Sequence, residues 1–198
     1  MKMKILAIAD EEARYFYDCY TPGRLDEYDL ILACGDLKAK YLEFLATMAH
    51  CPLLYVRGNH DDRFSEQPPE GCICIENQIY EYQGIRILGL GGSYRYRDGA
   101  NMYTESQMKR RIHRVSLQLW RKKGFDILLT HAPAYGINDL ESISHRGFEC
   151  FVGLLEKYAP KYFIHGHVHM SYDHKIPQIS SYKNTTVVNA CGYCRIDF

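Results

Sequence analysis

Polar residues with metal-binding side chains recur in five short clusters along the sequence. The clusters are Asp10-Glu11-Glu12, Gly35-Asp36, Gly58-Asn59-His60-Asp61, His131 and Gly166-His167-Val168-His169. Carboxylates, amides and imidazoles are the ligand types that hard and borderline divalent metals take. Glycines stand directly before Asp36, Asn59 and His167, where they permit the sharp turns that bring backbone close to a bound ion. The clusters therefore predict a metal site assembled from distant parts of the chain.

Each cluster also has an ordinary structural explanation. Gly35-Asp36 and Asn59-His60 are both combinations that are common in turns. His167 and His169 lie two residues apart, so on an extended segment they point to the same side, but such a pair alone is as often structural as ligating. Five such clusters, each directly after a predicted strand, are hard to obtain by accident, and together they favour the metal-site interpretation.

Short apolar strands alternating with amphipathic helices must position these residues. Strands are predicted at 4–9, 29–34, 53–56, 72–75, 79–82, 85–90, 125–130, 161–165, 185–188 and 193–198, and helices at 38–50, 104–123 and 148–158. The near-continuous apolar runs are typical of strands buried on both faces. Gln83-Gly84 predicts a hairpin, and Thr104 with Gln107 fits a capping box. We expect an α/β fold in which a two-sheet β-sandwich is flanked by helices on both sides, giving four layers.

Composition limits the classes of function. The 198 residues carry 24 basic and 24 acidic side chains, so the net charge is zero, and we expect one domain spanning 1–198 with no stable nucleic-acid binding. No apolar run is long enough to span a membrane. The apolar run near the N-terminus stops at Asp10, too early for a signal peptide, so a cytoplasmic location with reduced cysteines is expected.

The order of these clusters resembles the calcineurin-like metallophosphoesterases. Their pattern reads D-x-H, G-D, G-N-H-D/E, a strand-end H and G-H-x-H, and the resemblance extends from Asp10 to His169. The segment from His131-Ala132-Pro133 through Asp139, His145 and Gly147 looks most like the branch of small, capless phosphodiesterases. The resemblance implies the four-layer fold and hydrolysis of a phosphate ester.

The resemblance also implies a role for each matching residue. Two divalent metal ions would be held by Asp10, Glu12, Asp36, Asn59, His131, His167 and His169. Among these, Asp36 would bridge both ions, Asp10 and His169 would hold the first with the residue at position 12, and the others would hold the second. Asn59 and His60 would contact the substrate. The implied mechanism is in-line attack by a metal-bridging hydroxide, with His60 as the general acid and Asp61 orienting His60 and raising its pKa.

Position 12 departs from the family pattern, because Glu12 stands where the family usually has His. A carboxylate there would make the first site harder, so Mn²⁺ is the first expectation for both ions, with Mg²⁺, Fe, Ni²⁺ and Zn²⁺ as other possibilities. On an extended segment Glu12 would lie on the same side as Asp10. The alternative is that Glu11 or Glu12 only caps the following helical turn.

Two classes of function remain open from the sequence. The first is a hydrolase that acts on diesters rather than on phosphoproteins. So short a chain is expected to leave an open, shallow cleft, which suits small esters or nucleotides. The second is a catalytically reduced scaffold or binding protein of the same fold, which only Glu12 favours. No pattern specifies an oligomeric state. The C-x-x-C pair Cys191 and Cys194 lacks a second pair and is expected to be ordinary, and His113, His165 and His174 are expected to be structural.

Overall fold

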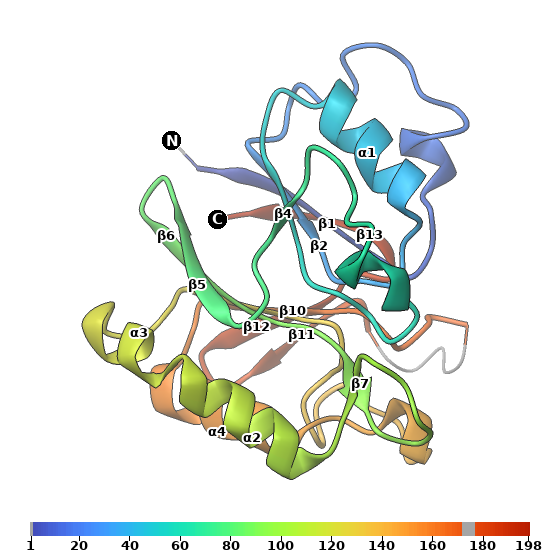
Figure 1. Ribbon diagram of the computed structural model, residues 1–198. Coiled ribbons are helices and arrows are strands. Elements are labelled where there is room, and N and C mark those ends of the chain that lie inside the picture. Colours follow the sequence, from blue (N-terminus) through green and yellow to red (C-terminus); the bar gives the residue numbers. More distant parts are fainter. Residues whose placement is uncertain (1, 172–176) are drawn as a thin grey trace.

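Two large β-sheets form the centre of the fold in the computed structural model, which describes residues 2–171 and 177–198 (Figure 1). Sheet A has the strand order β13 (Gly192–Asp197), β1 (Lys4–Ala9), β2 (Leu30–Ala33), β3 (Leu53–Tyr55) and β4 (Ile73–Cys74). Sheet B has the order β11 (Ile179–Tyr182), β12 (Thr185–Asn189), β10 (Tyr162–His165), β9 (Ile127–Thr130), β6 (Ile85–Leu90) and β5 (Gln78–Tyr82). A small pair joins β7 (Ser93–Tyr94) to β8 (Met102–Tyr103).

Alternate residues of each strand face opposite sides, and both sides are buried. In β1, Ile5 and Ala7 belong to the core shared with Ile127 and Leu129 of β9, between the two sheets. The intervening residue Leu6 belongs to a separate cluster on the outer face of sheet A. This burial on both faces explains why the strands read as continuous apolar runs rather than as an alternating pattern.

Helices cover the outer face of each sheet (Figure 1). On sheet A lies α1 (Ala39–Met48), and on sheet B lie α2 (Glu105–Arg114), α3 (Ser116–Arg121) and α4 (Glu149–Tyr158). Three single-turn 3₁₀ helices, η1 (Arg14–Phe16), η2 (Asp62–Ser65) and η3 (Ile143–His145), lie in the connections. The order helix, sheet, sheet, helix confirms the predicted fold class. Within the described ranges, no helix has the length and apolarity to cross a bilayer.

The region predicted as one helix at 104–123 forms two helices. Its start is as expected, because Thr104 and Gln107 make both hydrogen bonds of a capping box. At Val115 the backbone leaves the helical region (φ −92°, ψ 3°), and its N–H bonds to the carbonyl three residues back at Ile112. The break keeps Val115 buried and lets the side-chain carbonyl of Gln118 accept a hydrogen bond from the N–H of Ile79 at the start of β5. A tertiary contact thus ends the first helix earlier than periodicity predicts.

Most predicted strands are found within a few residues of their expected bounds, and β5 and β6 form the expected hairpin. Three strands were not predicted. The strands β7 and β8 are only two residues long, too short to produce a pattern. The strand β11 alternates between exposed and half-buried residues at the edge of sheet B, and it pairs with β12.

The carboxyl ends of the central strands meet at one edge of the sandwich. Strands β1, β2 and β3 run parallel in sheet A, and β6, β9, β10 and β12 run parallel in sheet B. A direct bond joins the two sets, because the N–H of His167 after β10 donates to the carboxylate of Asp10 after β1 (2.9 and 3.1 Å). The chain also passes from β12 of sheet B to β13 of sheet A at Ala190 and Cys191. Every predicted ligand cluster lies in a loop at this edge.

Candidate metal centre

Three of the predicted ligands turn the chain sharply as it leaves a strand. Asp10, Asp36 and His167 all have a positive φ, at 60°, 56° and 69°. Aspartate tolerates this left-handed conformation better than most residues, and strained backbone of this kind clusters at functional sites. The turns bend all three side chains back toward the edge where the two sheets meet.

Glycines allow two of these loops to pass through the same space. A Cβ on Gly58 would overlap with the carboxylate of Asp36, and a Cβ on Gly35 would overlap with the backbone of Gly58. Asp61 then joins the loops, because one of its carboxylate oxygens accepts hydrogen bonds from the N–H groups of both Asp36 and Gly58 at 2.8 Å. The two loops after β2 and β3 are therefore interlocked at their backbones.

His131 is the centre of a buried polar cluster at this edge. Its Nε2 lies 3.0 Å from Oδ1 of Asn59, 3.1 Å from Nδ1 of His167 and 3.4 Å from Oδ2 of Asp36. His131 is fully buried, and Asn59 and His167 are nearly so. The cluster draws two residues from the strand ends of sheet A and two from those of sheet B. Among the described residues, Asp36, His131 and His167 form one of two groups with the geometry to hold a metal ion.

Main-chain carbonyls fix the orientation of both imidazoles. Nδ1 of His131 lies 2.8 Å from the carbonyl oxygen of Cys34, and Nε2 of His167 lies 2.6 Å from that of Ser144. A carbonyl can only accept a hydrogen bond, so these two nitrogens carry protons. The remaining nitrogens, Nε2 of His131 and Nδ1 of His167, face each other across the cluster. Metal-binding histidines are held in this way, with the outer nitrogen bonded to a carbonyl or carboxylate.

Without a cation, a proton holds this cluster together. Burial disfavours a charge on His131, but the carboxylates of Asp36 and Asp10 outweigh burial and raise the pKa of His131 to about 9. Burial alone would raise the pKa of Asp36, but the neighbouring His131 lowers it to about 2. Burial and the charge on His131 lower the pKa of His167 to about 3. One positive charge thus lies among carboxylates in a buried site, in the place that a metal cation fits.

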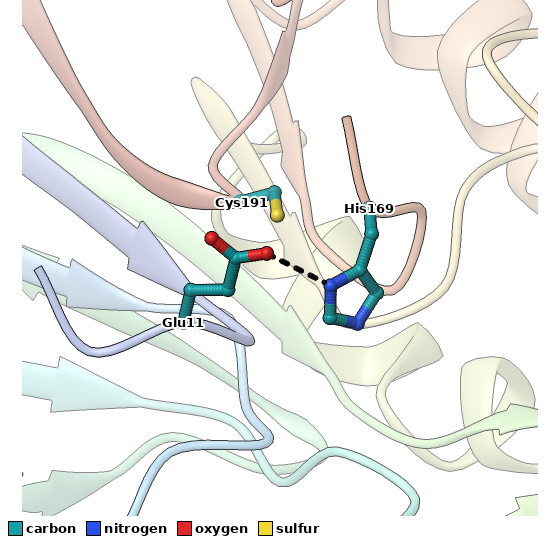
Figure 2. Close-up of side chains that lie close together, drawn as sticks. All are labelled: Glu11, His169 and Cys191. Carbon is teal, nitrogen blue, oxygen red and sulfur yellow. Dashed lines mark hydrogen bonds and ion pairs between the residues drawn. The ribbon is translucent and has the colours of Figure 1, made fainter. Parts of the chain in front are cut away.

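The second group lies beside the first and contains His169. Its Nδ1 lies 3.1 Å from Oε1 of Glu11, and the ligand atoms of His169, Glu11 and Cys191 all lie within 4.8 Å of one another (Figure 2). Asp10 adjoins both groups: burial raises its pKa to about 6, against the opposing effects of His131 and His169. These donors come from the ends of β1 and β10 and from the passage between β12 and β13.

Glu12 does not join His169. Its carboxylate forms an ion pair with Lys38 (3.1 Å), while the neighbouring Glu11 lies against His169. The expectation for Glu12 assumed an extended segment, but the chain turns at Asp10, and the N–H of Glu11 bonds back to the carbonyl of Ala9. The expectation of Mn²⁺ depended on Glu12 as a ligand, and it stays a prediction. No sequence pattern singled out Glu11.

His60 lies at the exposed side of the cluster. Its side chain is 63% exposed, and its Nε2 lies 4.0 Å from Oδ2 of Asp36. Asp61 was expected to orient the imidazole of His60. Its carboxylate instead accepts hydrogen bonds from the backbone N–H groups of Asp36 and Gly58. The backbone of His60 is held instead by its own N–H, which donates to Oδ1 of Asp36 at 2.8 Å.

The other histidines singled out from the sequence lie in different surroundings. His145 lies beside the cluster, with its ring centroid 5.4 Å from that of His167 and its Nδ1 2.7 Å from the hydroxyl of Ser142. His165 is fully buried in the sheet, and burial lowers its pKa to about 4, so it is neutral and structural as expected. His113 is exposed on α2, away from the cluster, and His174 lies outside the described residues.

The donors present fit divalent cations. The first group offers two oriented imidazole nitrogens, a carboxylate and an amide oxygen, and the second offers an imidazole, a carboxylate and a thiol. Imidazole, carboxylate and thiolate are the ligands of zinc and related ions in proteins. The sandwich and this edge together define a class of α/β proteins that gather metal ligands at the carboxyl ends of strands from two facing sheets.

Comparison with models of known protein families identifies the family of this chain. Residues 3–171 match the family model for calcineurin-like phosphoesterases, and the chain belongs to this family. No match was found among curated proteins.

Solved structures share the fold at low sequence identity. One crystal structure aligns with a TM-score of 0.71 and 16% identity, covering 100% of this chain and 95% of that chain. The protein TT1561 of Thermus thermophilus aligns with a TM-score of 0.61 and 15% identity, covering 96% of this chain and 90% of that chain. Vps29 of Chaetomium thermophilum aligns with a TM-score of 0.44 and 14% identity, covering 99% of this chain and 82% of that chain. At these identities the first two alignments show a similarity of fold alone.

Proposed function

We propose that this protein hydrolyses a phosphate ester with the help of two divalent cations, and that its preferred substrate is a phosphodiester. One observation carries the proposal. Asp36, Asn59, His131 and His167 converge within hydrogen-bonding distances although they come from four different strand ends. Buried charged groups such as these are normally paired with one another or coordinate a metal ion.

Hydrolysis of a phosphate ester brings an anionic nucleophile to an already anionic phosphorus centre. When bound, a pair of divalent cations lowers the pKa of a water and neutralises the charge on the phosphoryl oxygens. The residues of this chain supply the frame for that chemistry. His131 and His167 would hold one cation with Asn59, and His169 would hold the other with Asp10. Asp36 contacts His131 and lies near enough to Asp10 to affect its charge, so the two oxygens of its carboxylate would serve both ions.

His60 is placed to deal with the leaving group. Hydrolysis leaves an alkoxide that must be protonated, and histidine titrates in the range suited to that proton transfer. The exposed imidazole of His60 lies 4.0 Å from the carboxylate of Asp36 and is held to the cluster through its own N–H. His60 can therefore donate a proton to an oxygen of a substrate that approaches from solvent, without being a metal ligand itself.

The substrate class is proposed from the exposure of His60 together with the resemblance to small, capless phosphodiesterases. The side chain of His60 is 63% exposed, so a substrate can reach its imidazole from solvent. We propose a small phosphodiester or a nucleotide as the substrate. The preference for a diester rests on the resemblance to the capless phosphodiesterases.

A chromogenic assay tests the proposal. Protein freed of metal by a chelator is supplied with Mn²⁺, Mg²⁺, Zn²⁺ or Co²⁺, and hydrolysis of a nitrophenyl phosphodiester is compared with that of the monoester. We expect metal-dependent turnover that is faster for the diester and is lost in Asp36→Asn. Faster turnover of the monoester would contradict the preference for diesters. Absence of turnover with every metal would instead favour a scaffold or binding protein of the same fold.

A further inference from the structure

Cys191 lies where the chain passes from one sheet to the other, and the proposed function gives this residue no role. It follows β12 and precedes β13, at the point where the chain passes from sheet B to sheet A, and it forms an isolated bridge with Ala9 at the end of β1. Its partner in the C-x-x-C pair, Cys194, belongs to the core between the sheets. Cys191 lies outside that core, toward the loops that carry the metal ligands. The two cysteines therefore have different surroundings despite their spacing.

The thiol of Cys191 faces two other potential ligands. Figure 2 shows Glu11, His169 and Cys191 pointing toward one another from three separate segments. Oε1 of Glu11 lies 3.1 Å from Nδ1 of His169, and the ligand atoms of all three residues lie within 4.8 Å of one another. A carboxylate oxygen, an imidazole nitrogen and a sulfur at such separations can reach one cation with little movement.

Asn189 holds two of these segments in a fixed relation. It is fully buried, its side-chain N–H donates to the carbonyl of Val168 (2.7 Å), and its side-chain oxygen accepts from the N–H of Cys191 (3.1 Å). Val168 directly precedes His169. One amide side chain therefore ties the His169 loop to the Cys191 junction, and the two donors face each other before any ion is present.

We propose that Cys191 and Glu11 are metal ligands that complete the site of His169. This inference rests on the proposed function in one respect, which is that His169 binds a metal ion. As the sulfur–metal bond forms, the thiol loses its proton to solvent, and no oxidation or reduction takes place. The thiolate makes this site softer than one of oxygen and nitrogen donors alone, so it selects Zn²⁺ or Co²⁺ over Mn²⁺ and Mg²⁺. The cluster around His131 contains no sulfur, so the two sites differ in their spectra.

Cobalt absorption tests the inference without reference to activity. Chelator-treated protein is titrated with Co²⁺, and we expect a thiolate-to-metal charge-transfer band in the near ultraviolet that reaches its plateau by two equivalents per chain, when both sites are filled. Cys191→Ser is expected to lose the band while still binding Co²⁺ at the His131 cluster. Cys194→Ser is the matched control, a buried cysteine three residues along the chain, and it is expected to keep the band.

A second measurement does not depend on replacing a buried residue. Zn²⁺ is expected to slow the alkylation of Cys191 in the wild-type protein at least tenfold more than that of the equally buried Cys194, as followed by peptide mass spectrometry, whereas Mg²⁺ gives no such difference. Glu11→Gln alters an exposed side chain and is expected to weaken this protection.

The outcomes separate this inference from the proposed function. If Co²⁺ binds but the band is absent, or persists in Cys191→Ser, Cys191 is not a ligand, and the proposed phosphoesterase function stands. Equal alkylation rates with and without Zn²⁺ would lead to the same conclusion. If neither Co²⁺ nor Zn²⁺ binds at all, both this inference and the proposed function are overturned.

Discussion

Among single residues, the two hydrogen bonds from imidazole nitrogens to main-chain carbonyls have the largest consequence. They fix which nitrogens of His131 and His167 face the cluster, and the facing nitrogens lie only 3.1 Å apart. A proton or a metal ion must lie between them to avoid repulsion of their lone pairs. The raised pKa of His131 favours a protonated imidazole near neutral pH, which places a proton between the two nitrogens when no ion is bound.

The proton on His131 predicts how the stability of the metal-free protein depends on pH. The pKa of His131 rises from 6.5 to about 9 on folding, so between these values the folded state binds more protons than the unfolded state, and stability falls as pH rises. Above pH ~7, His167 is neutral in both states. Buried cysteines such as Cys34 and Cys191, whose pKa burial raises, also lower stability toward pH 9 in every variant. We therefore expect the wild-type protein to lose on the order of 2 kcal/mol more than His131→Asn between pH 7 and pH 9, measured by denaturant unfolding in the presence of a chelator. The same loss in His131→Asn would contradict this assignment.

His60→Ala tests the proton donor. The side chain is mostly exposed, so we expect the free energy of unfolding and the metal content to stay unchanged. The value of kcat is expected to fall by about 100-fold or more, the usual range for loss of a general acid. His113→Ala, an exposed histidine on α2, is the control and is expected to keep full activity. Full activity of His60→Ala at saturating metal would show that His60 takes no part in the reaction.

Among the elements, the loops after β2 and β3 decide the geometry of the site. The carboxylate of Asp61 accepts hydrogen bonds from an N–H group of each loop, and the two loops pass close together because Gly35 and Gly58 have no side chains. Strands alone would bring the carboxyl ends to one edge. The interlocked loops place the Asp36 carboxylate beside His131 rather than in solvent.

Gly58→Ala tests this interlock. The added Cβ would overlap with the Asp36 carboxylate, so that side chain must move. We expect a loss of about 1–3 kcal/mol in the free energy of unfolding and at least tenfold weaker metal binding. Gly153→Ala in α4 is the matched control, because a Cβ there meets no atom within 4 Å. It is expected to stabilise the protein by about 0.5–1 kcal/mol. Unchanged metal affinity in Gly58→Ala would contradict the role of the interlock.

The sequence predicts those elements and ligands that local patterns determine, and it misses those that depend on a turn or on a tertiary contact. Asp36, Asn59, His131 and His167 each follow a buried strand, and parallel strands bring such positions together, so their convergence was predictable. Glu11 was not, because the turn at Asp10 reverses the direction of the side chains after β1. Cys191 reaches the site through the crossing between sheets, which no local pattern encodes. The helix break at Val115 likewise depends on a tertiary contact, that between Gln118 and Ile79.

For the whole molecule, the cluster is a link between the two sheets. Asp36 and Asn59 come from sheet A, and His131 and His167 come from sheet B. At this edge, polar contacts join the two sheets in addition to the apolar core between them. One of them is the hydrogen bond from the N–H of His167 to the carboxylate of Asp10. An ion held by donors from both sheets would therefore bind the folded state and not the unfolded chain.

Metal binding is accordingly expected to stabilise the whole fold. At a free metal concentration ~100 times Kd, the gain is about 2.7 kcal/mol. For a chain of this size each kcal/mol corresponds to about 2–4 °C in Tm, so we expect a rise of about 5–10 °C. Scanning calorimetry of chelator-treated protein with and without Zn²⁺ or Mn²⁺ measures it. Asp36→Asn is the control and should show a smaller rise. Equal Tm values with and without metal would argue against a link between the sheets.

Calorimetric titration of chelator-treated protein with a divalent metal tests most directly whether these strand ends hold a pair of cations. The account predicts saturable binding of two ions per chain. In Asp36→Asn, which lacks the carboxylate proposed to serve both ions, we expect both ions to bind at least tenfold more weakly. No saturable binding, or an Asp36→Asn variant that binds two ions as tightly as the wild type, would contradict the account.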